Sequence, residues 1–167
     1  MNSMNYNSQF VRPEHLSLID VCTGCRGKCC IGRTLATDVE RTRIMQLAGA
    51  DHFVPWKDNI YYLPDGPCPY LRGQRCSVQD VKPFVCQIFP FVPRVIDGEF
   101  WLLCVGECDA ARTLPSEFVP RVQALARDFL LNWTPAQYEE YWLQNKQGDF
   151  DDTRVTLKIK VFSDGGS

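Results

Sequence analysis

Four cysteines lie within nine consecutive residues near the start of the chain, in the stretch Cys22-Thr-Gly-Cys25-Arg-Gly-Lys-Cys29-Cys30. Cysteine thiolates are soft ligands that bind zinc, copper(I) and the iron of iron–sulfur clusters. The two-residue gap between Cys22 and Cys25 lets two thiolates bind one metal ion, and glycines let the backbone turn tightly around it. A free cysteine can also pack as a small apolar residue, but such density favours a metal-binding loop.

Five further cysteines follow, and three of them arrive at turns. Pro67 precedes Cys68, a glycine-containing turn precedes Cys76, and Pro83 lies shortly before Cys86. Rigid prolines and permissive glycines at such turns can bring ligands that are distant in sequence to one centre. The candidate metal ligands are Cys22, Cys25, Cys29, Cys30, Cys68, Cys76, Cys86, Cys104 and Cys108.

The number of thiols allows several inorganic solutions. An iron–sulfur cluster takes four cysteines, as does one structural zinc ion. Nine cysteines could hold two such centres with one thiol to spare, or share bridging sulfurs in a polynuclear cluster. The predicted cofactor is therefore an iron–sulfur cluster or zinc.

Cys104 and Cys108 differ in local context. Cys104 ends an apolar run, where a buried thiol is a plain core residue, whereas Cys108 follows Gly106 in a predicted turn. We expect Cys108 to bind metal, and Cys104 to be either a ligand of a second centre or the spare thiol. His15 and His52 are weaker candidates because thiols are in surplus.

The order of the cysteine motifs resembles a known family. After the first loop come Gly66-Pro-Cys68-Pro-Tyr-Leu71, Cys76-Ser-Val and Lys82-Pro-Phe-Val-Cys86-Gln-Ile-Phe-Pro90. This order is similar to that of the cysteine-rich, zinc- or iron-chelating domains of the CxxCxxCC type, over about residues 20–112. The family also includes the cysteine-rich part of flagellin lysine N-methylases, which the chain resembles at Cys108-Asp-Ala-Ala-Arg112. It departs from the family at Lys82 and Gln87, where arginine is common.

Two classes of function fit these features. The first is a metal-binding module that holds the chain together or carries electrons or metal for a protein partner. The second, implied by the resemblance to the methylases, is an enzyme that uses the metal centre on a protein substrate. We expect the first class, because the chain has no glycine-rich nucleotide fingerprint after a strand and no Ser–His–Asp constellation.

Charge and hydropathy limit the kinds of partner and the cellular compartment that we expect for this chain. The formal net charge is −2, which gives no basic surface for nucleic acid. No apolar run approaches the length that spans a bilayer, and the first residues are polar rather than those of a signal peptide. We therefore expect a cytoplasmic protein with no membrane and no nucleic-acid partner, whose thiols bind metal in a reducing compartment.

The expected fold class is α+β, a small irregular cysteine-rich domain stapled by metal, with a β-hairpin and a C-terminal helical pair. Thr37 and Glu40 form a capping box that starts a helix over 38–48, whose Arg41 and Arg43 should form a solvated face. A strand is predicted over 59–63. Asp97-Gly98 predicts a hairpin of strands 91–96 and 99–104, with Pro93 at an edge.

Two helices and a strand should complete the chain, over about 116–130, 134–148 and 154–161. The predicted organisation is a loose N-terminal segment (1–19), a cysteine-rich metal-binding domain (20–112), and a helical hairpin with a terminal strand (113–167) packed on it. Together these parts are expected to form one compact domain.

Overall fold

The computed structural model describes residues 30, 34–106, 108–140 and 154–162. Within them, helices and antiparallel strands are mixed, as the α+β prediction required. The predicted segment 1–19, the cysteines Cys22, Cys25 and Cys29, and the second half of the last predicted helix lie outside the described residues. The elements in chain order are β1 (Leu35–Thr37), α2 (Asp38–Ala48), β2 (Val54–Lys57), β3 (Ile60–Tyr62), β4 (Leu71–Arg72), β5 (Arg75–Cys76), η1 (Gln79–Val81), α3 (Phe84–Ile88), β6 (Phe91–Ile96), β7 (Glu99–Val105), η2 (Asp109–Arg112), α4 (Phe118–Leu130), α5 (Pro135–Tyr138) and β8 (Val155–Lys160).

The first half of the fold contains α2 and a small antiparallel sheet in the order β1-β3-β2. The predicted capping box is present: the Thr37 side chain accepts from the Glu40 N–H, and Glu40 reaches back to Thr37. Gly49 ends α2 in the left-handed conformation, with φ of 70°, which glycine adopts without a steric cost. A buried cluster joins the helix to the sheet and the following loops; it consists of Ala36, Ile44, Phe53, Leu63, Tyr70 and Val78.

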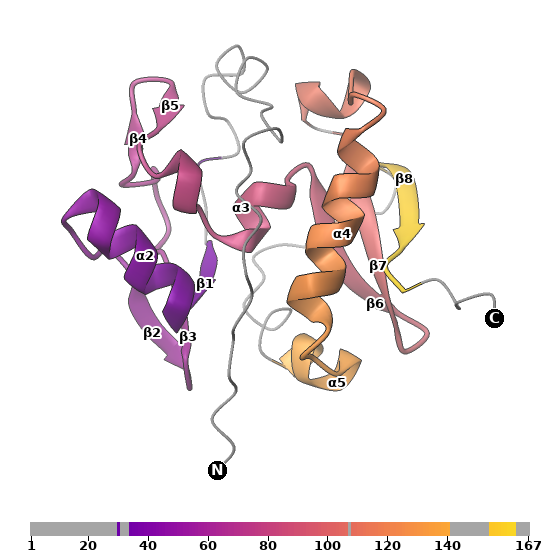
Figure 1. The fold of residues 1–167 in the computed structure, drawn as a ribbon, viewed down its shortest axis with the longest axis horizontal. Coiled ribbons are helices and arrows are strands. Elements are labelled where there is room, and N and C mark those ends of the chain that lie inside the picture. Colours follow the sequence, from indigo (N-terminus) through magenta and orange to yellow (C-terminus); the bar gives the residue numbers. More distant parts are fainter. Residues whose placement is uncertain (1–29, 31–33, 107, 141–153, 163–167) are drawn as a thin grey trace.

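The second half is a three-stranded antiparallel sheet in the order β6-β7-β8, with α4 packed on it (Figure 1). The predicted hairpin is confirmed, and Asp97 and Gly98 both have positive φ (52° and 76°), as the tight two-residue turn requires. Pro93 lies on β6, an edge strand, as expected. The apolar face of α4 packs on the sheet through buried residues that include Val122, Ala126 and Leu130.

The short helix α3 lies between the two halves in Figure 1, and the sequence did not predict it. Pro83 precedes it, and its first residue, Phe84, is 1% exposed. The Phe84 ring stacks on Phe129 of α4, with ring centroids 4.0 Å apart and planes 7° apart. A second link is the ion pair of Lys57 on β2 with Glu140 after α5. The helix that carries Cys86 is therefore at the junction of the two halves.

The last two predicted elements begin as expected. Thr134 caps α5 through a capping box with Gln137, and Pro135 occupies the first turn. β8 adds to β7 in antiparallel register, with Cys104 opposite Leu157. Among the described helices, none is both long enough and apolar enough to cross a membrane.

Candidate metal centre

Cys30, Cys68, Cys76 and Cys86 belong to the first half of the fold and to α3. Cys68 follows Pro67 in a turn, Cys76 is the last residue of β5, and Cys86 is the third residue of α3. The Cys68 N–H donates to the Cys30 carbonyl oxygen at 2.9 Å. This hydrogen bond places Cys30 beside the turn that carries Cys68. All four residues are half-buried and free of disulfides.

A very small hairpin sets Cys76 in relation to Cys68. β4 pairs with β5 so that Leu71 lies opposite Cys76, and Gly73 turns the chain with φ of 61°. The carbonyl oxygen of Tyr70 accepts from both the N–H and the hydroxyl of Ser77, each at 2.8 Å. These contacts close the loop on which the two thiols lie.

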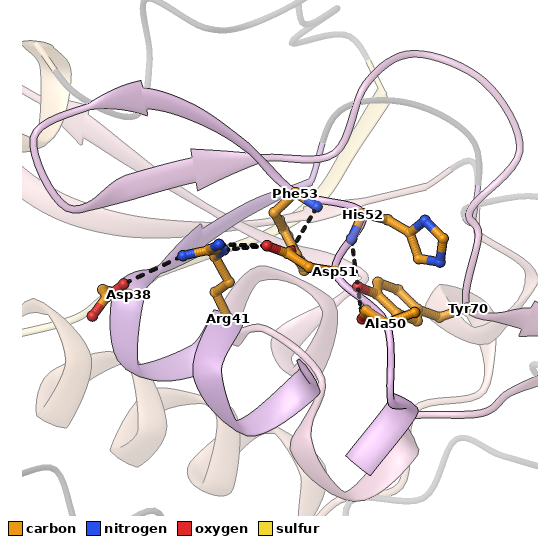
Figure 2. Close-up of polar contacts among 7 residues, drawn as sticks. All are labelled: Asp38, Arg41, Ala50, Asp51, His52, Phe53 and Tyr70. Carbon is orange, nitrogen blue, oxygen red and sulfur yellow. Dashed lines mark hydrogen bonds and ion pairs between the residues drawn. The ribbon is translucent and has the colours of Figure 1, made fainter. Parts of the chain in front are cut away.

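Tyr70 anchors this loop to the segment after α2. Its side chain is 3% exposed, and its hydroxyl donates to the Ala50 carbonyl oxygen at 3.4 Å and accepts from the His52 N–H at 3.3 Å (Figure 2). Burial raises the pKa of Tyr70, so the hydroxyl stays protonated and can donate. The His52 ring packs edge-on against Tyr70, with centroids 5.3 Å apart.

The same segment is fixed to α2 by Arg41, whose partly solvent-exposed side chain pairs with Asp51. Arg41 Nε donates to the Asp51 carboxylate at 2.9 Å (Figure 2). The guanidinium carbon lies 4.3 Å from the centre of the Tyr61 ring. Asp51 also accepts from the Phe53 N–H at 3.1 Å. The sequence could not reveal these contacts, because Arg41 is in α2, Asp51 is in the loop after it and Tyr61 is in β3.

The thiol of Cys86 is influenced by two other cysteines. Burial is the main reason that the pKa of Cys86 is raised, to about 12; Lys82 and the Thr34 hydroxyl lower this pKa, while Cys76 and Cys68 raise it. The Thr34 hydroxyl lies 3.9 Å from the Cys86 sulfur. A desolvated thiol with other thiols near it does not ionise readily, whereas a bound cation favours the thiolate form.

Cys104 and Cys108 form a second group. Cys104 is 1% exposed in the core under α4, and burial raises the pKa of its thiol, with Cys108 adding to the increase and Thr156 opposing it. Gly106 between them comes so close to β8 that an added Cβ would lie 2.8 Å from the Arg154 carbonyl oxygen. The turn is thus fixed against β8, and both thiols pack with the core of the second half.

A family model described as "Putative zinc- or iron-chelating domain", of the CxxCxxCC type, matches residues 21–116, more than half of the chain. The chain belongs to the CxxCxxCC family. All nine cysteines lie inside the matched range, whereas α4, α5 and β8 lie beyond it. No curated protein and no solved structure matches the chain.

The donors of this CxxCxxCC domain fit zinc or iron by their chemistry, because they are thiols, the ligands of structural zinc and of iron–sulfur clusters. Among residues 30, 34–106, 108–140 and 154–162, no three Cys, His, Asp or Glu side chains form a group that could hold a metal ion. Cys22, Cys25 and Cys29 are outside those ranges, as is His15. Within the described residues, Cys68 and Cys76 raise the pKa of the Cys86 thiol, and Cys108 raises that of the Cys104 thiol.

Sequence reasoning missed three supporting residues of the CxxCxxCC domain: Thr34, Glu40 beyond its cap, and Tyr70. Glu40 was predicted only as a capping residue, yet it is 2% exposed and also accepts from the Phe84 N–H of α3. The only local signal for a role of Glu40 is its position in the capping box of α2. Its burial depends on α3, which the local sequence did not predict.

Proposed function

We propose that the chain is a metal-binding protein in which cysteine thiolates hold zinc or an iron–sulfur cluster. The proposed ligands of the first centre are Cys22, Cys25, Cys29, Cys30, Cys68, Cys76 and Cys86. Cys108 is the proposed ligand from the second group, with Cys104 either beside it in a second centre or spare. Membership of a zinc- or iron-chelating family supports the general activity.

The observation that carries the proposal is that Cys68 and Cys76 both act on Cys86 and raise the pKa of its thiol. These residues come from a turn, a two-residue strand and a five-residue helix, and the two distant thiols still raise the pKa of the third. A purely apolar role does not require thiols from two elements to lie near enough to act on a third. Zinc or iron between such sulfurs would stabilise the thiolate forms.

We propose a structural contribution first, with electron or metal transfer to a protein partner as the further use of the centre. β4 and β5 are only two residues long each, and two-stranded hairpins of this size are unstable alone. Metal binding that bridges Cys68 and Cys76 to Cys30 and Cys86 would therefore supply folding free energy to this half of the molecule.

The test is the metal content of the reduced protein purified without oxygen, measured by plasma mass spectrometry together with its absorption spectrum. Zinc in colourless protein supports a zinc centre, and iron with acid-labile sulfide and absorption at roughly 400 nm supports a cluster. Protein that is folded, monodisperse and free of both metals would overturn the proposal. A Cys76→Ser variant should lose bound metal, whereas a Ser116→Ala control, at an exposed residue that is not a candidate ligand, should keep it.

A further inference from the structure

The carboxylate of Glu40 lies at the point where β1, α2 and α3 meet. One oxygen, Oε2, accepts from the Thr37 N–H at 2.8 Å and from the Thr37 hydroxyl at 3.0 Å. The other, Oε1, accepts from the Phe84 N–H at 2.6 Å. Burial raises the pKa of Glu40, and the hydrogen bonds from Thr37 and Phe84 oppose this increase. Both oxygens of this buried carboxylate therefore accept hydrogen bonds, as buried polar groups normally do.

The hydrogen bond from Phe84 to Glu40 supplies a cap for α3, which has no capping side chain of its own. The residue before the helix is Pro83, and no side chain caps it locally. The first N–H groups of a helix have no intrahelical acceptor. Glu40 therefore provides the acceptor for Phe84 from 44 residues earlier in the chain.

Glu40 joins β1 to α3, and these two elements also carry the Cys86 side chain and its neighbour: Cys86 is in α3, and Thr34 comes just before β1. Cys86 is in the first turn of α3, and its N–H donates to the Pro83 carbonyl oxygen at 2.9 Å. Thr34, whose hydroxyl is 3.9 Å from that sulfur, directly precedes β1, which ends at Thr37. Holding Thr37 and Phe84 on one carboxylate thus fixes the distance between the Thr34 and Cys86 side chains.

We propose that Glu40 is a positioning residue for the metal centre, which sets the Cys86 thiol against β1 in the geometry that metal binding requires. The inference rests on the proposed function, since Cys86 is one of the proposed ligands. Groups that orient metal ligands without touching the metal typically change its affinity by about 10- to 100-fold.

The chain contains a matched comparison in the capping box of α5. There, one oxygen of Gln137 accepts from the Thr134 N–H at 3.0 Å and from its hydroxyl at 3.1 Å, as Glu40 Oε2 does with Thr37. Glutamine therefore serves this box with its single oxygen. In Glu40→Gln the box is kept, but an NH₂ group faces the Phe84 N–H, and two donors cannot pair.

The experiment compares wild type, Glu40→Gln and Gln137→Ala, each as full-length, reduced protein. Zinc affinity is measured by competition with a chromophoric chelator, and the alkylation rate of Cys86 is measured in metal-free protein by mass spectrometry. Glu40→Gln should weaken zinc binding about 10- to 100-fold and speed alkylation of Cys86. Gln137→Ala, which deletes the remote box, should leave both quantities within about twofold of wild type.

Zinc affinity and Cys86 reactivity unchanged in Glu40→Gln would overturn the inference, as would an equal loss in Gln137→Ala. If wild type binds no zinc and carries no iron, the proposed function fails instead, and the alkylation rates still report on the Glu40–Cys86 link. Should Glu40→Gln not fold, hydrogen exchange of wild type decides. Binding of zinc must then slow hydrogen exchange of the Phe84 backbone N–H more than that of the Gln137 backbone N–H, because coupling between two sites is reciprocal.

Discussion

The Phe84 N–H donates to the carboxylate of Glu40 at 2.6 Å, although the two residues are 44 positions apart. The Phe84 ring stacks on Phe129 of α4. The backbone of α3 is thus held by the first half of the molecule and its first side chain by the second. Cys86, two residues further on, is fixed by both halves.

Replacing Phe129 by alanine should destabilise the protein by about 3–5 kcal/mol, the usual cost of deleting a buried aromatic ring. Phe129 is 8% exposed, and its ring is the stacking partner of Phe84. Urea unfolding followed by circular dichroism measures the loss. Leu131→Ala, at a residue 72% exposed near the end of the same helix, is the control and should change stability by less than about 0.5 kcal/mol. Equal effects of the two substitutions would contradict the stacking role.

Alanine at Gly106 should cost about 1–3 kcal/mol, because its Cβ would lie 2.8 Å from the Arg154 carbonyl oxygen and 3.0 Å from the Thr156 methyl group. The backbone oxygen belongs to the residue just before β8 and cannot move aside as a flexible side chain would. Thermal unfolding of the variant measures the cost. A melting temperature equal to that of wild type would show that the turn between Cys104 and Cys108 is not fixed against β8.

The Asp51–Arg41 pair predicts a pH dependence of stability. Arg41 holds the pKa of Asp51 below its usual value, which is about 3.9 in unfolded chains. The contribution of the pair is therefore fully present above about pH 4 and is lost as pH falls through the lowered pKa of the folded state. The stability difference between wild type and Asp51→Asn, measured in urea, should shrink over that acidic range.

Asp38→Asn is the control for this pH series. Asp38 lies 3.7 Å from Arg41 but its side chain is 53% exposed, and exposed ion pairs contribute little. This variant should stay close to wild type at each pH. A stability difference for Asp51→Asn that is constant down to acidic pH would contradict the assigned pair.

Cys76→Ser and Cys104→Ser should affect bound metal differently, because the two thiols belong to different groups. Cys76 acts on Cys86, whereas Cys104 is buried under α4 beside Cys108. Cys76→Ser should remove the metal of the first centre, and Cys104→Ser should leave that metal in place. Metal analysis of the two purified variants makes the comparison. Loss of the same metal from both would mean that all the thiols share one centre.

The sequence predicted the elements whose signals are local. The Thr37–Glu40 box, the Asp97-Gly98 turn and the Thr134-Pro135 cap each fix a backbone conformation through neighbours in the chain, and all three are present. Helix α3 was not predicted, because the groups that stabilise it, the Glu40 carboxylate and the Phe129 ring, come from distant segments.

The site was predictable in its chemistry but not in its grouping. The spacing of the cysteines indicates metal binding, and the family match agrees. That Cys68 and Cys76 act on Cys86 while Cys108 acts on Cys104 depends on how the loops are anchored, by Tyr70 in one case and by Gly106 in the other. Such contacts between distant segments carry no periodic signal in the sequence.

Removing the metal tests most directly whether thiol-bound metal holds the cysteine-rich half together. The reduced, full-length protein is stripped with a chelator, and its circular dichroism and thermal unfolding are recorded before stripping, after it, and after metal is restored. We expect stripped protein to lose secondary structure and cooperative unfolding, and restored protein to regain both. A stripped protein with the full spectrum and an unchanged, cooperative melting transition would contradict the account.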